Sequence, residues 1–322
     1  MSKTDILRQQ ISLFDEAYEQ GNPLITDTEY EKMYSELQKL EKLEGERVIP
    51  DSPTQKIVYI RIPGLETVKH TIPILSLEKT TDFNGLKKWI SQADDSVLIE
   101  PKLDGLTIVL RYSDGKLVDA ITRGNGYEGE RVLHTIQTIQ NLPKYIDFMG
   151  NLEIRGEVYI SFADFERVNN GEYANPRSLA AGTVRLLDAS VASERGLAIQ
   201  IFDLIEAEGM IFETAHEQNL FLARLGFPMV TSFLVKNLSA AQEKILKYDK
   251  YIRSKLPYPI DGMVLKFNSI AIRKQLGVNS KTPKWGIAYK FESEEAFTTL
   301  NNIIVQVGKT GQITPVAVFE PI

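Results

Sequence analysis

The chain has 322 residues, a formal net charge of −6 at pH 7, 43% hydrophobic residues and 25% charged residues. This length exceeds one small domain, so we expect two domains or more. Cysteine is absent, which excludes disulfides and thiolate metal sites within the chain. No apolar run approaches the roughly 18 residues of a membrane span, and the first residues lack a signal-peptide core, so we expect a cytoplasmic protein with no membrane partner. The negative charge argues against a self-sufficient DNA clamp, because nucleic-acid binders are more often basic.

Residues 1–45 are predicted to form a helical hairpin. Apolar side chains recur at helical spacing as far as Tyr18, and Gly21-Asn22-Pro23 then interrupts the pattern. Thr26 or Asp27 can cap a second helix, and Glu29 is available for a capping box.

The charge of the chain is uneven. Residues 1–60 hold 7 Lys/Arg and 12 Asp/Glu, which gives −5 and leaves −1 for the remainder. An acidic module attached to a nearly neutral body suggests separate functions. The alternative is an appendage that serves packing alone.

Residues 46–72 are predicted to be a linker with turns. Residues 72–77 then open the main body, and Asp82 is a candidate cap for a helix that runs through Trp89.

Residues 97–110 contain two apolar runs around a short polar break, a pattern that predicts a strand, a tight turn and a second strand. Pro101 cannot donate a ladder hydrogen bond, so we expect the first strand to end there. Gly105 permits a close backbone approach or a positive φ. Lys102 is thereby offered at a strand end as a candidate nucleophile. The alternative is an exposed lysine in a surface hairpin.

The later elements mix hairpins with separate helices, which indicates an α+β fold rather than regular βαβ winding. Asp114-Gly115 predicts a hairpin turn, and the glycine-rich residues 120–130 precede a predicted helix at 131–140. The other predicted elements are a strand at 151–160, helices at 162–170, 178–187 and 214–225, strands at 261–267 and 287–291, and a hairpin at 303–320.

Charged residues stand inside several of these apolar, strand-like runs. Such charges cost stability unless they are paired or bind a ligand. Together they suggest one polar cleft between sheets, whereas the alternative is a set of unrelated positions that face solvent. They are Glu100, Lys102, Arg155, Glu157, Asp261, Lys266 and Lys290.

A cleft with several cations and a few carboxylates suits a nucleotide. Lys and Arg bind phosphate oxygens, whereas carboxylates accept from ribose hydroxyls or an adenine amine, or hold Mg²⁺. A lysine attacks only as the neutral amine, and nearby cations disfavour its ammonium form. We expect Lys266 and Lys290 to act on Lys102 in this way. The implied reaction is attack by Lys102 on an α-phosphorus, which leaves a lysyl phosphoramidate.

Four motifs are similar, in their order, to the nucleotidyltransferase motifs of covalent polynucleotide ligases. They are Glu100-Pro-Lys102-Leu-Asp104-Gly105, Arg155-Gly-Glu157, Asp261-Gly-Met-Val-Leu-Lys266 and Trp285-Gly-Ile-Ala-Tyr-Lys290-Phe. Further stretches narrow the resemblance to the bacterial-type NAD-dependent DNA ligases, and it covers essentially the whole chain. These stretches are residues 51–55, 75–77, 122–126, 175–177, 181–182, 256–257 and 307–311.

The resemblance implies a covalent nucleotidyltransferase fold, an α+β architecture with antiparallel sheets and flanking helices. It implies that NAD⁺ adenylylates Lys102 and that Glu100 reads the adenine. The other implied nucleotide contacts are Ser76 and Leu77 beside the nucleoside, Phe202 stacked on the base, Asp104, Arg123 and Glu157 on the nucleotide, Lys266 and Lys290 on the α-phosphate, Arg177 and Arg185 in the phosphate region, and Asp261 helping to place Mg²⁺.

The helical hairpin resembles the nicotinamide mononucleotide-binding module of this family, with Tyr18, Asp27 and Tyr30 matching and Glu31 also expected at the NAD⁺ site. Its acidity suits the cationic nicotinamide ring, which can stack on tyrosine. Closure of the module would place the mononucleotide leaving group in line with Lys102.

Four positions depart from the family pattern. Ala17 stands where a ring-bearing residue usually precedes Tyr18, and Glu31 stands where Asp is usual. Ser178 and Lys79 each stand where Asn is usual. The first two bear on NAD⁺ affinity and not on the lysine chemistry.

The implied domains are a nicotinamide mononucleotide-binding module at 1–60, a nucleotidyltransferase domain at 61–302 and a truncated start of an OB-fold at 303–322. The family continues into a cysteine zinc module, so zinc is expected only beyond this chain. We expect a monomeric fragment that forms the enzyme–adenylate. In the full-length protein the AMP would pass to the 5′-phosphate of nicked double-stranded DNA, in replication and repair.

Two alternatives stay open. The first is an ATP-dependent polynucleotide ligase or a capping-type nucleotidyltransferase, which shares the lysine motif but lacks a hairpin like residues 1–45. The second is a non-catalytic homologue that binds NAD⁺ without chemistry. Labelling by ATP but not by NAD⁺ would favour the first alternative, whereas a covalent adenylate that Lys102→Ala abolishes would exclude the second.

Overall fold

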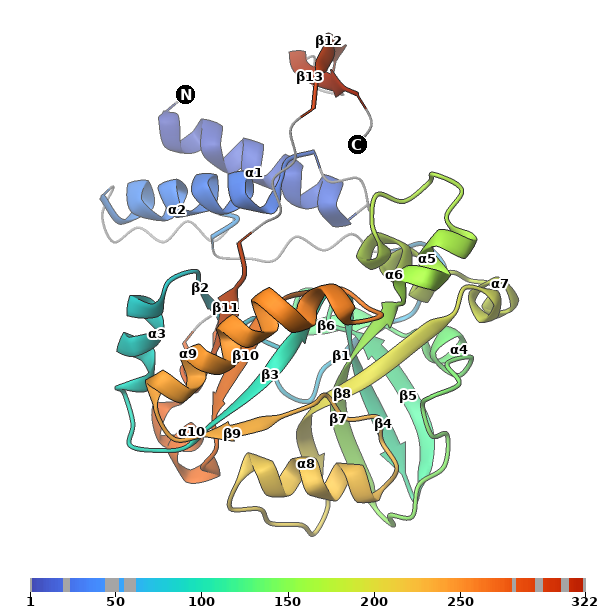
Figure 1. Cartoon of the computed structure of the whole chain (residues 1–322). Coiled ribbons are helices and arrows are strands. Elements are labelled where there is room, and N and C mark those ends of the chain that lie inside the picture. The colour runs from blue at the N-terminus through green and yellow to red at the C-terminus, as the bar shows by residue number, and fades with distance from the viewer. Residues whose placement is uncertain are drawn as a thin grey trace. The chain divides into compact units, whose positions relative to one another are not determined.

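A computed structural model gives the structure of the chain and describes residues 2–19, 24–43, 52–54, 62–279, 282–292, 298–307 and 313–320. The chain divides into two compact units, Met1–Phe291 and Glu292–Ile322. Figure 1 shows the elements in chain order from blue to red. Within the described ranges, no helix is both long and apolar enough to cross a bilayer.

Helices α1 (Lys3–Glu19) and α2 (Asp27–Leu43) form the expected N-terminal hairpin. Its small core consists of the buried side chains of Leu7, Ile11 and Leu37. These positions recur at helical spacing, which places them on the facing sides of the two helices.

Thr26 caps α2. Its hydroxyl accepts from the Glu29 N–H at 3.3 Å, and the Glu29 carboxylate accepts from the Thr26 N–H at 3.0 Å. This is the reciprocal capping box that the sequence predicts. A further tie comes from Arg8 on α1, whose Nε donates to the Glu41 carboxylate on α2 at 2.8 Å.

Two sheets form the framework of the rest of the first unit (Figure 1). Among its described residues, the larger sheet has the order β2-β11-β10-β3-β9 and the smaller has the order β5-β4-β7-β8. Neighbouring strands are antiparallel in both, except that β2 and β11 run parallel. The larger sheet contains β2 (Glu78–Thr80), β3 (Val97–Leu103), β9 (Phe233–Val235), β10 (Ile260–Phe267) and β11 (Gly286–Lys290). The smaller sheet contains β4 (Leu106–Ser113), β5 (Lys116–Thr122), β7 (Asn151–Ile160) and β8 (Leu197–Ala207), and β1 (Thr67–Lys69) pairs with β6 (Glu128–Glu130).

Helices cover one face of each sheet and bury its apolar side chains. On the larger sheet these are α3 (Phe83–Ile90), α9 (Leu238–Lys247) with its π-helical continuation η1 (Tyr248–Ile252) and the 3-10 turn η2 (Arg253–Lys255), and α10 (Ile270–Leu276). On the smaller sheet they are α4 (Leu133–Ile136), α6 (Pro176–Val184) and α8 (Ala215–Arg224), and the short helices α5 (Phe162–Val168) and α7 (Ala189–Glu194) lie in the connections between strands. Figure 1 shows α9 lying across the larger sheet.

Most predicted elements are confirmed. The Asp82 side chain caps α3 by accepting from the Gly85 N–H at 2.8 Å. Asp114 and Gly115 have φ values of 47° and 77°, so the expected tight turn joins β4 to β5. The predicted helix at 131–140 is shorter than expected, because after α4 the N–H groups of Thr138 and Ile139 bond to carbonyls three residues back.

The expected hairpin across residues 97–110 is wrong. Strand β3 lies in the larger sheet and β4 in the smaller one, so the chain crosses between sheets at Asp104 and Gly105. The Asp104 N–H donates to the Pro259 carbonyl at 3.0 Å, which anchors the crossing. A Cβ at Gly105 would lie 2.1 Å from the Val158 carbonyl oxygen, so only glycine fits this close approach.

The expected strand end at Pro101 is also wrong, because β3 continues to Leu103. Strand β9 covers β3 only from Val97 to Ile99. Pro101 therefore lies where β3 is an edge on that side, a position at which proline is tolerated.

Several elements were not predicted: β1, β2, β6, α7, β8, β9, α9 and α10. Strand β8 is the largest of these, and its buried residues Leu197, Ile199 and Ile201 alternate as in a half-buried strand. Of the predicted linker, residues 46–51 and 55–61 lie outside the described residues.

The second unit contains β12 (Leu300–Val307) and β13 (Ile313–Phe319), which pair antiparallel as the predicted hairpin. Its expected turn, residues 308–311, lies outside the described residues. Large apolar side chains of this hairpin, such as Ile303 and Phe319, are more than half exposed at 56% and 55%.

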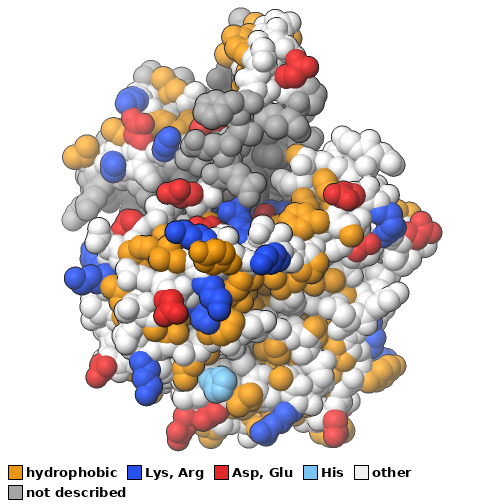
Figure 2. Space-filling model, viewed as in Figure 1, with side chains coloured by type: hydrophobic (Ala, Val, Ile, Leu, Met, Phe, Trp, Pro, Cys, Tyr) orange, Lys and Arg blue, Asp and Glu red, His pale blue; other side chains and the backbone are white. Residues whose placement is uncertain are grey.

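Basic, acidic and hydrophobic side chains are interspersed on the face of the molecule that Figure 2 shows. No continuous basic surface covers the described residues of that face. This distribution agrees with the nearly neutral charge of the chain after residue 60.

Candidate active site

The face of the larger sheet opposite α3 and α9 carries the predicted nucleophile. Lys102 on β3 stands opposite Gly262 on β10, which stands opposite Lys290 on β11. Side chains two residues apart share a face, so Glu100 and Lys266 lie on this face as well. The opposite face holds the apolar core, including Ile99, Met263 and Ile287. The register therefore gathers four predicted residues from three strands.

A β-bulge directs Asp261 toward Lys102. Ile260 pairs with Leu103 and Gly262 pairs with Lys102, so Asp261 is an extra residue on β10. Lys102 Nζ donates to both carboxylate oxygens of Asp261, at 2.8 and 2.9 Å. Both side chains are 23% exposed, so this pair is accessible to solvent at one end.

The bonded neighbour of Lys102 is the Asp261 carboxylate, a partner that the expectation about Lys266 and Lys290 does not include. Lys266 Nζ instead bonds to Glu100 Oε2 and to the Phe202 carbonyl, each at 2.7 Å. Charge balance explains the difference, because a buried ammonium requires an anionic partner.

Glu100 is held inside the protein, at 2% exposure. Besides Lys266, it accepts from Asn219 Nδ2 at 3.3 Å. Phe202 on β8 is close to this group, since its ring centroid lies 5.9 Å from Lys266 Nζ and 5.8 Å from Arg155 Cζ. The predicted base-reading and base-stacking residues are therefore neighbours.

A second group of charges links the two sheets. Arg177 at the start of α6 donates to Asp104 at 2.6 Å. Burial alone would raise the pKa of Asp104, but the charges of Arg177, Lys102 and Lys290 outweigh it and lower that pKa. Lys102 and Lys290 are therefore electrostatic neighbours of Asp104.

Glu157 on β7 has the opposite shift. Burial raises the pKa of Glu157, and the charges of Arg177, Lys102 and Arg123 and a 2.8 Å hydrogen bond from Thr107 oppose this only in part. Arg123 itself lies 3.5 Å from the Ser76 hydroxyl, Nη1 to Oγ. Leu77 is next to β11, because a Cβ on Gly286 would lie 2.9 Å from its Cδ2.

Arg155 pairs with Asp203 on the neighbouring strand β8, with its Nε 3.0 Å from Asp203 Oδ2. Burial alone would raise the pKa of Asp203, but the charges of Arg155, Lys266 and Arg273 outweigh it and lower that pKa. Sequence reasoning missed Asp203 because it missed β8.

Arg185 is not on the polar face. It is only 8% exposed and pairs with the buried Glu130, whose carboxylate lies 3.1 Å from Arg185 Nε. Asn219 was missed as well, although a polar residue on the apolar stripe of α8 was a signal that could have found it.

Of the residues expected at the nicotinamide site, the structure describes only the Tyr30 side chain. Tyr30 donates its hydroxyl to Asp15 at 2.7 Å, and its ring stacks on Tyr34 at a centroid distance of 5.8 Å. The side chains of Tyr18, Asp27 and Glu31 lie outside the described residues.

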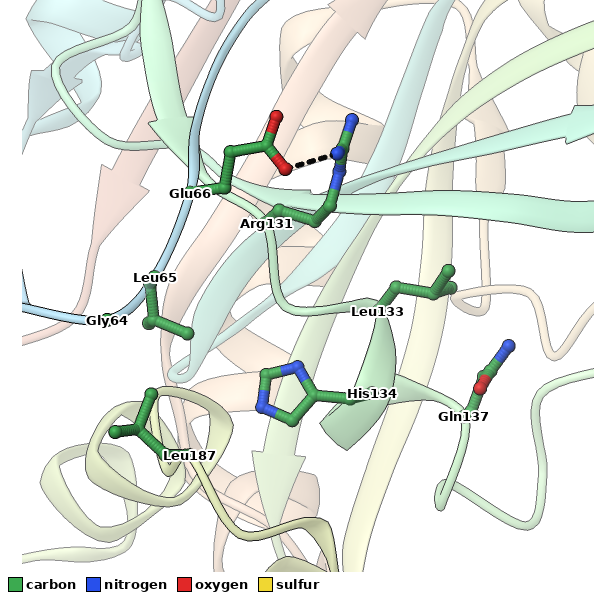
Figure 3. A pocket seen from close by; sticks show the side chains of 8 residues that line it. All are labelled: Gly64, Leu65, Glu66, Arg131, Leu133, His134, Gln137 and Leu187. Atoms are coloured by element: carbon green, nitrogen blue, oxygen red, sulfur yellow. Dashed lines mark hydrogen bonds and ion pairs between the residues drawn. The ribbon is translucent and has the colours of Figure 1, made fainter.

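A pocket of about 410 Å³ lies elsewhere in the first unit, and Figure 3 shows its lining. An ion pair between Glu66 and Arg131 borders it, with His134 and Leu187 on another side. His134 Nε2 is already bonded to the Leu186 carbonyl at 2.8 Å. None of the predicted nucleotide residues lines this pocket, so the polar face of the larger sheet remains the candidate site.

Comparisons with known proteins match nearly the whole chain. One family model, described as the NAD-dependent DNA ligase adenylation domain, matches residues 63–294, and another, the DNA ligase-like N-terminal NAD⁺-binding domain, matches residues 1–58. A DNA ligase of Clostridium kluyveri is 39% identical and one of Lacticaseibacillus casei is 38% identical, with 99% and 100% of this chain covered and 50% of each relative. The chain thus spans about half the length of these curated relatives.

Similarity to solved structures is weaker. An archaeal ATP-dependent RNA ligase is 17% identical, with a TM-score of 0.42, over 68% of this chain and 48% of its own. The family models cover both the helical hairpin and the sheets that hold Lys102. Since the two models match residues 63–294 and 1–58, the chain belongs to the NAD-dependent DNA ligase adenylation domain family.

Proposed function

We propose that the chain catalyses the self-adenylylation step of an NAD-dependent DNA ligase. Lys102 Nζ attacks the α-phosphorus of the AMP half of NAD⁺, and a P–N bond forms. The bond from that phosphorus to the bridging oxygen breaks, and nicotinamide mononucleotide leaves with its phosphate. Lys102 carries AMP as a phosphoramidate at the end of the step.

The observation that carries the proposal is the position of Lys102. It lies on the same sheet face as Glu100, Lys266 and Lys290, and this face is shared by three adjacent strands. The ammonium must lose a proton before it attacks. Asp261 accepts a hydrogen bond from Lys102 at 2.8 Å and is 23% exposed, so the proton can pass through this carboxylate to water and leave Asp261 ionised.

The neighbouring residues are proposed to bind the AMP half. Buried Glu100 and the adjacent Phe202 are placed to receive a base, since one accepts hydrogen bonds and the other offers an aromatic face. Lys290 and Lys266 supply positive charge for the α-phosphate. The remaining proposed nucleotide contacts are Ser76, Leu77, Asp104, Arg123, Glu157 and Arg177.

Magnesium is part of the proposal, with Asp261 as its protein ligand. The described residues contain no cluster of three or more His, Cys, Asp or Glu side chains arranged to hold a metal. Mg²⁺ commonly binds through one or two carboxylates together with water and substrate phosphate, so a single aspartate fits it. When bound, it would neutralise charge on the phosphates.

The helical hairpin is proposed to bind the nicotinamide mononucleotide half of NAD⁺ through Tyr18, Asp27, Tyr30 and Glu31. The matched N-terminal family model supports this assignment. The domain boundaries at 60 and 302 are proposed with it. In a longer protein, AMP would then pass to nicked DNA in the cytoplasm, during replication and repair.

Intact-mass spectrometry tests the proposal. Incubation with NAD⁺ and Mg²⁺ should add the mass of one AMP, and added nicotinamide mononucleotide should remove it. Lys102→Ala should abolish the gain, whereas Lys274→Ala, at an exposed lysine on α10, should not change it. A gain from ATP but not from NAD⁺ would indicate an ATP-dependent enzyme. The absence of any adduct, with NAD⁺ bound, would indicate a non-catalytic homologue.

A further inference from the structure

Asn219 is a buried polar residue on the inner face of α8. A capping box between Thr214 and Glu217 fixes the start of this helix, and its buried residues are Ala215, Asn219 and Leu222. Their spacing of four and three places them on one side of the helix. Asn is a poor helix former, and a buried amide costs free energy unless it is bonded. An apolar residue is therefore the expected choice at this position.

The amide of Asn219 reaches the candidate base-binding residue. Its Nδ2 lies 3.3 Å from Glu100 Oε1 and 3.5 Å from Ser232 Oγ. A carboxylate only accepts hydrogen bonds, so the amide must present its nitrogen to Glu100. Asn219 is 9% exposed and Glu100 is 2% exposed, so water competes little for this bond.

The two oxygens of Glu100 are thus held from two sides. Lys266 holds Oε2 at 2.7 Å, and Asn219 holds Oε1. A contact at one oxygen alone would leave the carboxylate able to rotate about that oxygen. The second contact fixes its plane, while further lone pairs of the carboxylate stay available to a ligand.

We propose that Asn219 is a positioning residue that sets the base preference of the nucleotide site by fixing the Glu100 carboxylate. This inference rests on the proposed function, in which Glu100 faces the base. A fixed carboxylate accepts a hydrogen bond from the exocyclic amine of a 6-amino purine. Opposite a 6-oxo purine, two acceptors meet and repel each other. A carboxylate that can rotate avoids this repulsion, so the site then discriminates less.

Asn219→Leu removes the donor and keeps the side-chain size. The rate of adduct formation on Lys102 is measured with NAD⁺ and with nicotinamide hypoxanthine dinucleotide. We expect the ratio of the two second-order rate constants for adduct formation to fall about tenfold, the size expected for one lost hydrogen bond to a charged group. The change should be in the NAD⁺ concentration that gives half the maximal rate and not in the maximal rate itself, because Glu100 is proposed to contact the base rather than the reacting phosphorus. Leu220→Asn, on the outer side of the same helix where Leu220 is 46% exposed, should leave the ratio unchanged.

Asn219→Asp provides a near-isosteric second variant. It places a second carboxyl group against Glu100, and two such groups do not both ionise readily. We expect its preference for NAD⁺ to be weakest at pH 8 and to recover as the pH falls and one carboxyl becomes a donor. A ratio that equals wild type at every pH would overturn the inference, even if Asn219→Leu fails to fold.

Calorimetric binding of AMP and IMP separates this inference from the proposed chemistry. Wild-type protein that prefers AMP but forms no adduct would refute the chemistry, and loss of that preference in Asn219→Leu would still support the positioning role. A folded Asn219→Leu protein that keeps both the AMP preference and the kinetic ratio within about twofold would overturn the role of Asn219.

Discussion

Replacing Lys266 by Met removes the ammonium group that faces Glu100 in the interior of the first unit. The two residues are 5% and 2% exposed, and Lys266 Nζ bonds to Glu100 Oε2 and to the Phe202 carbonyl at 2.7 Å each. Met preserves the length and apolar character of the stem. We expect Lys266→Met to lower the free energy of unfolding by about 3–5 kcal/mol, the usual cost of leaving a buried charge unpaired.

The magnitude follows from the geometry of the pair. Two unit charges separated by 2.7 Å attract each other by about 6 kcal/mol at an effective dielectric constant of about 20. In the intact pair, the cost of desolvating both ions offsets much of this attraction. In Lys266→Met, the desolvation cost of Glu100 remains and the attraction is lost. The bond from Asn219 and the charge of the buried Arg273 still compensate Glu100 in part, and a hydrogen bond of this kind contributes about 1.5–3 kcal/mol.

Urea unfolding measures the effect. Lys274→Met changes an exposed lysine and should alter the free energy of unfolding by no more than about 0.5 kcal/mol. The double variant Lys266→Met/Glu100→Gln removes the unpaired charge and should recover at least half of the loss, with a coupling energy of about 2 kcal/mol. A loss below about 1 kcal/mol in Lys266→Met, or additive effects in the double variant, would refute the reasoning about a buried ion pair.

Two further predictions concern the smaller sheet. Burial raises the pKa of Glu157 in the folded state, so the folded protein binds that proton more tightly than the unfolded chain does. The contribution of Glu157 to stability is therefore greatest below its pKa in the unfolded chain. It is lost as the pH rises through its higher pKa in the folded protein. Glu157→Gln should remove this fall and be more stable than wild type at pH 8, and identical pH profiles in urea unfolding would contradict this. Gly105→Ala puts a Cβ 2.1 Å from the Val158 carbonyl oxygen and should lower the free energy of unfolding by about 3 kcal/mol. The control is Gly209→Ala, where φ is 75° and no atom lies within 4 Å, and it should lower that free energy by only about 1 kcal/mol. Equal shifts of the two variants in thermal unfolding would argue against the close approach at Gly105.

Local signals in the sequence suffice for many elements. The cap at Asp82, the turn at Asp114-Gly115 and the apolar run at 151–160 each act within a few residues. Their outcome does not depend on distant parts of the chain. Strand β8 carries such a signal too, in the alternation of Leu197, Ile199 and Ile201.

Sheet membership is not encoded in this local way. Two apolar runs around a turn are equally compatible with a hairpin and with a crossing between sheets. The crossing is favoured by the pairing of β3 with β10, in which Lys102 meets Asp261 across 159 residues of sequence. No pattern within residues 97–110 carries that information.

The position of Asp261 shows a second limit. Simple alternation along β10 would place Asp261 and Gly262 on opposite faces of the sheet. One extra residue in the ladder brings the Asp261 carboxylate to Lys102 instead. A bulge depends on the partner strand, so residue spacing on β10 alone could not reveal that the neighbour of Lys102 is a carboxylate.

The crossing at Asp104 and Gly105 has a mechanical consequence. Because β3 passes directly into β4, the two sheets share a covalent seam two residues beyond Lys102. The Asp104–Pro259 hydrogen bond reinforces this seam. This short connection restricts relative displacement of the two sheets close to Lys102, which favours a fixed position for its amine.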